Sequence, residues 1–105
     1  MNPRMTLAQR LGQVDEFAAL MKARIVEEEN AGRDEWDTWT TSQLLVRVVE
    51  CTSEVFSAVS AGFPPEEFAR ACANLANYSM IVAHLALTRG LEDTKAMQAP
   101  SARLP

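Results

Sequence analysis

Apolar residues recur at alternating spacings of four and three from Leu7 to Ile25, and this pattern constrains the fold more than any other feature. The series is Leu7, Leu11, Val14, Ala18, Met21 and Ile25. Such a spacing predicts a helix with a coiled-coil-like apolar seam, which we expect to pack along another helix for its full length. Thr6 and Gln9 fit a capping box, so the helix is predicted to begin at Thr6.

Residues 44–59 also form an amphipathic helical pattern. The sequence Thr40-Thr41-Ser42-Gln43 supplies a cap before it, and Gly62 follows its expected end at about Ser60. We therefore predict a second long helix.

A third helix is predicted after the sequence Pro64-Pro65-Glu66-Glu67, because proline suits the first turn and acidic residues favour the positive end of the helix dipole. Its helical pattern covers residues 66–86, and Gly90 is expected to end it. The segment from Asn30 to Trp39 is predicted to connect the first two helices.

Length and composition favour a single globular domain rich in regular structure, and the three helical patterns make it all-α. The chain has 105 residues, of which 48% are hydrophobic, with only 4 glycines and 5 prolines. We expect a helical domain over residues 1–90 and a flexible C-terminal tail over 91–105, where Pro100 and Pro105 lie.

Charge and cysteine content exclude several classes of function. A net charge of −4 and a pI near 4.9 argue against binding to duplex nucleic acid or to an anionic membrane, but not against a small anion in a local basic pocket. Cys51 and Cys72 lack metal-ligand spacing and indicate core residues in a reducing cytoplasm. His84 is the only histidine, and the sequence contains neither a nucleophile elbow nor a glycine-rich phosphate loop.

Two short motifs resemble those of the MazG-like all-α nucleoside triphosphate pyrophosphohydrolases. One is Glu50-Cys51-Thr52-Ser53-Glu54, which is similar to the family's Glu-Glu-x-x-Glu motif on one helix. The other is Ala71-Cys72-Ala73-Asn74, which stands where the family has Glu-x-x-Asp, and it continues into Asn74-Leu75-Ala76-Asn77-Tyr78. The resemblance implies a MazG-like bundle of three long helices completed by oligomerisation, with magnesium held against a triphosphate.

Three substitutions reduce the metal site that this resemblance implies. Cys51 offers a soft thiol where magnesium prefers hard oxygen, Ala71 offers no ligand, and Asn74 keeps one carbonyl oxygen without the charge. The remaining pair, Glu50 and Glu54, suffices for one weakly held magnesium but not for a multi-metal site. The alternative interpretation of the pair is a solvated helix face. A missing carboxylate could come from elsewhere, for example from Glu67, one turn before Ala71.

The segment from Asn30 to Trp36 resembles the family segment that helps to close the nucleotide site. The resemblance implies that Arg33 contacts phosphate, and that Trp36 stacks on a base, unless Trp36 instead anchors the loop. Asn77 suits a base or sugar edge, or alternatively an interhelical hydrogen bond. The full set of predicted nucleotide-binding residues is Arg33, Trp36, Asn77, Asn30, Lys22, Arg47 and Asn74.

The expected function is therefore binding of a nucleotide or another small phosphorylated ligand, with sequestration or sensing in place of hydrolysis. The alternatives are a magnesium-dependent pyrophosphohydrolase with a reduced metal site, and an oligomeric scaffold without a ligand. Because the apolar faces exceed what one short chain can bury, we also expect a homo-oligomer, either a dimer or a tetramer.

Overall fold

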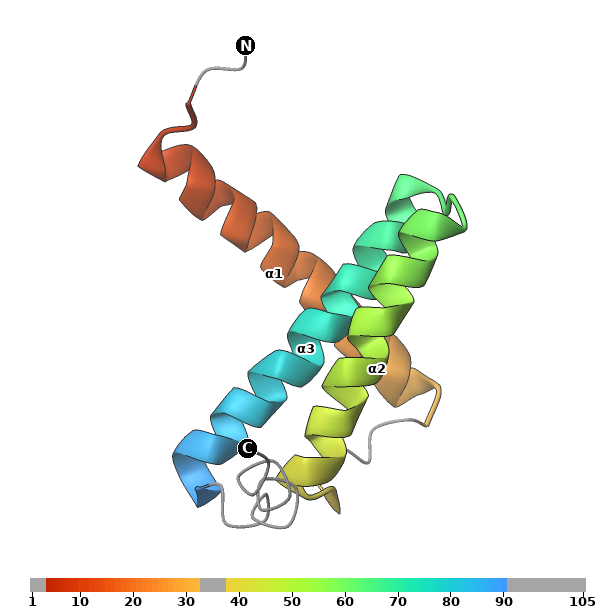
Figure 1. Cartoon of the computed structure of the whole chain (residues 1–105). Helices are drawn as coiled ribbons and strands as arrows, with labels where there is room; N and C mark the ends of the chain where they lie inside the picture. Colours follow the sequence, from red (N-terminus) through yellow and green to blue (C-terminus); the bar gives the residue numbers. More distant parts are fainter. Residues whose placement is uncertain (1–3, 33–37, 91–105) are drawn as a thin grey trace, which may run out of the picture.

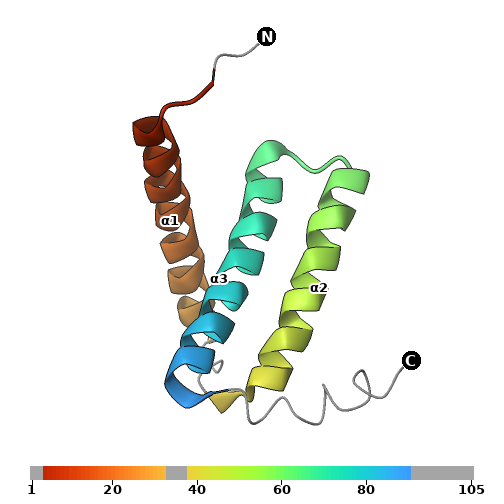
Figure 2. The same ribbon diagram turned by 60° about the vertical axis from the view of Figure 1, so that its left-hand side comes forward.

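The computed structural model describes residues 4–32 and 38–90, and its described part consists of three helices. They are α1 (Leu7–Asn30), α2 (Thr41–Ser60) and α3 (Pro65–Arg89). α2 and α3 form an antiparallel hairpin, and α1 crosses α3 with its C-terminal half while its N-terminal half diverges from the hairpin (Figures 1 and 2). The predicted all-α architecture of three long helices is thus confirmed.

Capping contacts confirm the predicted starts of α1 and α2, and a proline in the first turn marks that of α3. Thr6 Oγ1 accepts a hydrogen bond from the Gln9 backbone at 3.1 Å, and the Thr6 N–H donates to Gln9 Oε1 at 2.8 Å. Thr40 and Gln43 repeat the same reciprocal pair at the start of α2. Pro65 occupies the first turn of α3, where its missing N–H leaves no hydrogen bond unmade.

The turn between α2 and α3 depends on Gly62. Its φ of +68° is the left-handed conformation that closes a Schellman motif. The Phe63 N–H donates to the Ala58 carbonyl at 3.0 Å, and the Gly62 N–H donates to the Val59 carbonyl at 3.1 Å. Because both bonds satisfy the last carbonyls of α2, the chain can reverse at once into α3.

The hairpin core contains residues that recur along one side of each helix. On α2 these are Leu44, Cys51 and Ala58, and on α3 they are Ala73, Ile81 and Leu85. The small residues let the helices approach closely near the turn, whereas Trp39 and Tyr78 pack against the larger Leu44–Ile81–Leu85 cluster at the opposite end. Trp39 and Tyr78 stack with ring centroids 6.5 Å apart.

Within one chain, the α1 seam does not pack along another helix for its full length, since only Ala18 and Met21 of the seam are half-buried. Leu7, Leu11 and Val14 are 70%, 56% and 63% exposed, and Ile25 is 37% exposed. Four further residues that are buried or half-buried lie on the face adjacent to the seam: Phe17, Leu20, Arg24 and Glu28. α1 meets α3 through a mixed face, in which Phe17 and Leu20 accompany the hydrogen bonds of Arg24 and of the Met21 carbonyl with asparagines of α3.

Other large apolar side chains are exposed on α2 and the following turn. They are Val46, Val49, Phe56, Val59 and Phe63. No helix within the described ranges is long and apolar enough to cross a membrane.

Candidate functional site

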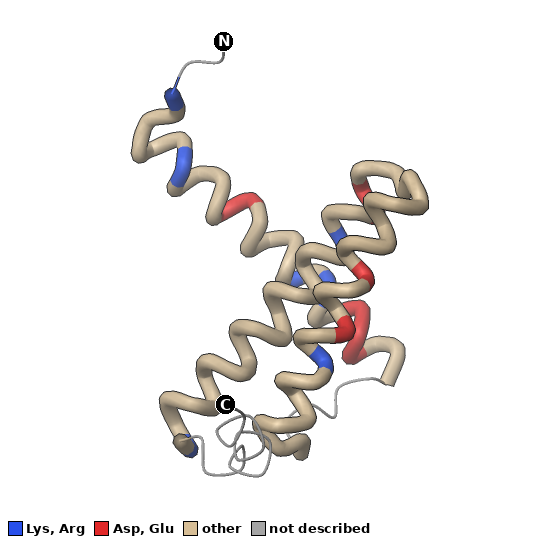
Figure 3. Tube along the Cα trace, in the orientation of Figure 1, with Lys and Arg blue, Asp and Glu red and all other residues tan. Residues whose placement is uncertain are grey.

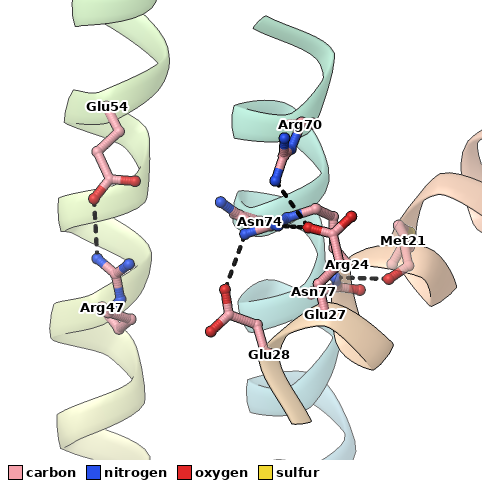
Figure 4. Close-up of polar contacts among 9 residues, drawn as sticks. All are labelled: Met21, Arg24, Glu27, Glu28, Arg47, Glu54, Arg70, Asn74 and Asn77. Atoms are coloured by element: carbon pink, nitrogen blue, oxygen red, sulfur yellow. Dashed lines mark hydrogen bonds and ion pairs between the residues drawn. The ribbon is translucent and has the colours of Figure 1, made fainter. Parts of the chain in front are cut away.

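A buried arginine, Arg24, holds α1 against α3. Its side chain is 10% exposed, and Nε donates to Asn74 Oδ1 at 2.8 Å (Figure 4). Its terminal nitrogens donate to Glu27 and, at 2.9 Å, to Glu28 one turn further along α1. A buried guanidinium needs this degree of pairing, since an unpaired charge in the interior costs several kcal/mol (order of magnitude).

Arg70 joins the same cluster from α3. Its Nη2 donates to Glu27 Oε2 at 2.8 Å, and this is the oxygen that also accepts from Arg24. One carboxylate oxygen thus lies between two guanidinium groups that come from different helices (Figure 4). Both Arg70 and Glu27 are about half exposed, at 52% and 48% of their side chains.

These arginines line an open groove of about 510 Å³, which we call the Arg24 groove. Nine residues from all three helices and the hairpin turn form it: Arg24, Ser53, Glu54, Ser57, Phe63, Glu67, Arg70, Ala71 and Asn74. Acidic and basic residues meet in this region, where α1 crosses the hairpin (Figure 3). The groove contains three of the motif positions identified from the sequence, namely Glu54, Ala71 and Asn74. It also contains Glu67, the proposed source of a further carboxylate.

Glu50 and Glu54 are linked through one cation. Arg47 Nη1 lies 3.2 Å from Glu54 Oε1 and 3.9 Å from Glu50 Oε2. However, Glu50 lines a separate hollow of about 290 Å³ with Trp39, Gln43, Val46 and Arg47, whereas Glu54 lines the Arg24 groove. Over residues 4–32 and 38–90, no group of three or more His, Cys, Asp or Glu side chains could hold a metal ion. The carboxylate pair that does share a groove is Glu54 with Glu67.

Arg47 is held by several groups at once. Its guanidinium lies 5.2 Å from the centroid of the Tyr78 ring. Partial burial lowers the pKa of Arg47, but hydrogen bonding with Tyr78 and Glu54 outweighs it and raises the pKa above its ordinary value. Arg47 is therefore a permanent cation that fixes α2 against α3.

The remaining predicted site residues are dispersed. Asn77 is 6% exposed, and its Nδ2 donates to the Met21 carbonyl at 3.0 Å, which is the interhelical role that the sequence left open. Its Oδ1 is buried without a hydrogen-bond partner in the described structure. Lys22 and Asn30 are exposed on α1 and line neither hollow. Arg33 and Trp36 lie outside the described residues.

Cys51 is fully buried in the hairpin core and does not line the groove. Burial raises the pKa of its thiol, despite the opposing effect of Arg47. Cys51 therefore remains a neutral thiol and acts as a small core residue, as the sequence indicated.

Sequence reasoning missed Arg24 and Arg70. Arg70 had a local signal, because it lies one turn before Asn74 on the same helix and precedes Ala71 directly. Arg24 had none, since its partner Asn74 is fifty positions away. Comparisons of the chain with protein-family models, with curated proteins and with solved structures gave no match.

Proposed function

We propose that this protein binds a nucleotide or another small phosphorylated ligand in the Arg24 groove, with little or no hydrolysis. The observation that carries the proposal is the position of Glu27 Oε2, which accepts hydrogen bonds from both Arg24 and Arg70. Two guanidinium groups that hold one anionic oxygen at the edge of a groove are also suited to hold a phosphate oxygen.

Glu27 would compete with the ligand for these two arginines. A terminal phosphate carries more negative charge than a carboxylate and offers three acceptor oxygens. Because the Glu27 side chain is about half exposed, it can move into solvent when a phosphate replaces it. Arg24 would keep its contacts with Glu28 and Asn74, so the buried guanidinium stays paired during the exchange.

The rest of the groove offers contacts for a phosphorylated ligand. Ser53 and Ser57 supply hydroxyl groups, and the Nδ2 group of Asn74 is a donor because its Oδ1 accepts from Arg24. Phe63 provides an aromatic surface at the hairpin end of the groove, and bases of any identity stack on such a surface.

Isothermal titration calorimetry would test the proposal. The titrants are nucleoside mono-, di- and triphosphates, cyclic nucleotides and inorganic tripolyphosphate, each with and without magnesium. Arg70→Ala should weaken binding by roughly ten- to a hundredfold, because losing a charge-assisted contact costs about 1.5–3 kcal/mol. The half-exposed position of Arg70 means that the fold should survive the change.

Two further variants sharpen the experiment. Glu27→Gln should strengthen binding, since a neutral amide competes less well for the guanidinium groups. Arg89→Ala, which removes an exposed arginine in the last turn of α3, should leave the affinity for the ligand unchanged. If no titrant binds, or if binding is indifferent to both Arg70→Ala and Glu27→Gln, the groove is not the site and the scaffold alternative gains support.

A magnesium-dependent pyrophosphohydrolase is the second candidate, and the pair Glu54 and Glu67 favours it. Both line the Arg24 groove, and magnesium is commonly bound by one or two carboxylates together with water and substrate phosphates. Two carboxylates are a chemically suitable donor set for one such ion. When bound, magnesium would neutralise charge on the phosphate oxygens, while Arg24 and Arg70 would orient the phosphate chain.

A further inference from the structure

The apolar stripe of α1 is the strongest feature that ligand binding leaves unused. Leu7, Leu11, Val14 and Ile25 of the stripe are exposed, whereas Ala18 and Met21 are half-buried. Leu7, Leu11 and Val14 lie on the half of α1 that diverges from the hairpin, and all three are more than half exposed (Figures 1 and 2). The stripe continues past Ala18 to Ile25, beside the face that contacts α3. Within the described part of one chain, Leu7, Leu11 and Val14 stay uncovered.

The spacing of the stripe is that of a two-stranded coiled coil. Leu11, Ala18 and Ile25 occupy one core position of successive heptads, and Leu7, Val14 and Met21 occupy the other. A surface of this kind is self-complementary, because the same seam on a second helix supplies the matching knobs and holes. The stripe therefore fits a second copy of this chain.

The charges beside the stripe select its orientation. In a parallel pair, the residue directly before the Leu11 core position on one helix faces the residue five positions later on the partner helix. This arrangement places Arg10 of one helix opposite Asp15 of the other. Both residues are exposed and available for this contact. An antiparallel pair over the same residues, with Leu7 opposite Ile25, would instead place Asp15 opposite Asp15 and Arg10 opposite Arg24.

The geometry points to a parallel homodimer in which the α1 stripes of two copies pack against each other and Arg10 of each copy pairs with Asp15 of the other. In each copy, the α2–α3 hairpin packs against the face of α1 next to the stripe. A two-fold axis along the stripe therefore puts the two hairpins on opposite sides of the α1 pair. This inference does not depend on the proposed ligand, and the experiment below needs none.

The molar mass of the full chain in solution gives the first test. Light scattering coupled to gel filtration, over micromolar to hundred-micromolar concentration, should show twice the 11.6 kDa of one chain. Leu11→Asp should raise the dimer dissociation constant at least about tenfold and leave a helical monomer, because Leu11 is outside the hairpin core. Phe56→Asp, at another apolar position that is more than half exposed, on α2, is the control and should leave the dimer intact.

Charge exchange tests the orientation. Arg10→Glu and Asp15→Arg should each weaken the dimer, and the double variant should restore it, because the parallel pair then regains opposite charges. Val14→Cys should form an intermolecular disulfide under mild oxidation, since equivalent core positions face each other only in the parallel arrangement.

Three results would overturn the inference. They are a monomer at every concentration, a dimer lost through Phe56→Asp but not through Leu11→Asp, and a dimer strengthened by Arg10→Glu. The last result would indicate antiparallel packing.

Discussion

Arg24 Nε donates to Asn74 Oδ1 at 2.8 Å, and this hydrogen bond joins α1 to α3 in the lining of the candidate groove. Asn74 stands where the sequence resemblance would imply an aspartate. In this protein its amide therefore acts as the acceptor for a buried arginine that is already shared with Glu27 and Glu28. One contact thus connects the packing of α1 with the polarity of the site.

Arg24→Leu should test how much of the α1–α3 contact depends on this arginine. We expect a loss of about 1–3 kcal/mol in the free energy of unfolding, because Asn74 Oδ1 loses its donor and Glu28 loses its ion pair. Urea denaturation followed by circular dichroism measures the change. Arg89→Leu, which removes an exposed arginine and its 3.3 Å hydrogen bond to the Trp39 carbonyl, serves as the control, and an equal loss in both variants would contradict the prediction.

Hydrolysis of nucleoside triphosphates should be at or near background with magnesium or manganese. The groove retains Glu54 and Glu67, but Ala71 and Asn74 supply no negative charge. Ala71→Glu together with Asn74→Asp should raise pyrophosphate release, measured in a coupled phosphate assay with pyrophosphatase. Substantial wild-type turnover that Glu54→Gln abolishes would instead favour the pyrophosphohydrolase.

A third carboxylate at Cys51 should not help hydrolysis. Because Cys51 is fully buried and outside the groove, Cys51→Glu would place a charge in the hairpin core. We expect this variant to lose its cooperative thermal transition by circular dichroism, whereas Ala71→Glu, on the groove surface, should retain it. A folded and more active Cys51→Glu variant would show that Cys51 is accessible to the ligand.

The buried thiol of Cys51 should make folding sensitive to alkaline pH. In the unfolded chain the thiol ionises near its ordinary value of 9.0, whereas burial raises the pKa of the folded one. Above that pH the unfolded state binds fewer protons than the folded state. The stability that the neutral buried thiol contributes is therefore complete below pH 9 and declines above it. The stability difference between wild type and Cys51→Ala should therefore shrink from pH 8 to pH 10.5 in urea titrations. A constant difference would contradict a raised pKa.

Replacement of Gly62 and of Gly12 by alanine should change the stability of the protein in opposite directions. Gly62 has a φ of +68°, so Gly62→Ala should destabilise the protein by about 1 kcal/mol although a Cβ meets no atom within 4 Å. Gly12 lies within α1 and also has open space around it, so Gly12→Ala should stabilise by about 0.5–1 kcal/mol. Thermal unfolding of the two variants beside wild type measures both effects.

Part of the candidate site was accessible from the sequence. Glu54, Ala71 and Asn74 share a groove because their positions on α2 and α3 follow from helix periodicity and a tight hairpin turn. The sequence could not predict that Glu50 lies outside that groove. Its position beside Arg47 depends on how α2 is rotated about its axis relative to α3. For Asn77 the sequence left two roles open, a ligand contact and an interhelical hydrogen bond. The structure shows the interhelical hydrogen bond, to the Met21 carbonyl.

The sequence by itself determined the three helices and their ends. Capping by Thr6 and Thr40, the Pro64–Pro65 start and the glycines after α2 and α3 act through residues a few positions apart, so their effect does not depend on the rest of the fold. Only the tertiary structure decided which face of α1 meets α3. The apolar seam predicted one face along its full length, but the contact of Arg24 with Asn74, fifty positions away, places the adjacent face against α3. Hydrogen bonds over such separations form only when the helices have already been brought together, which no local pattern encodes.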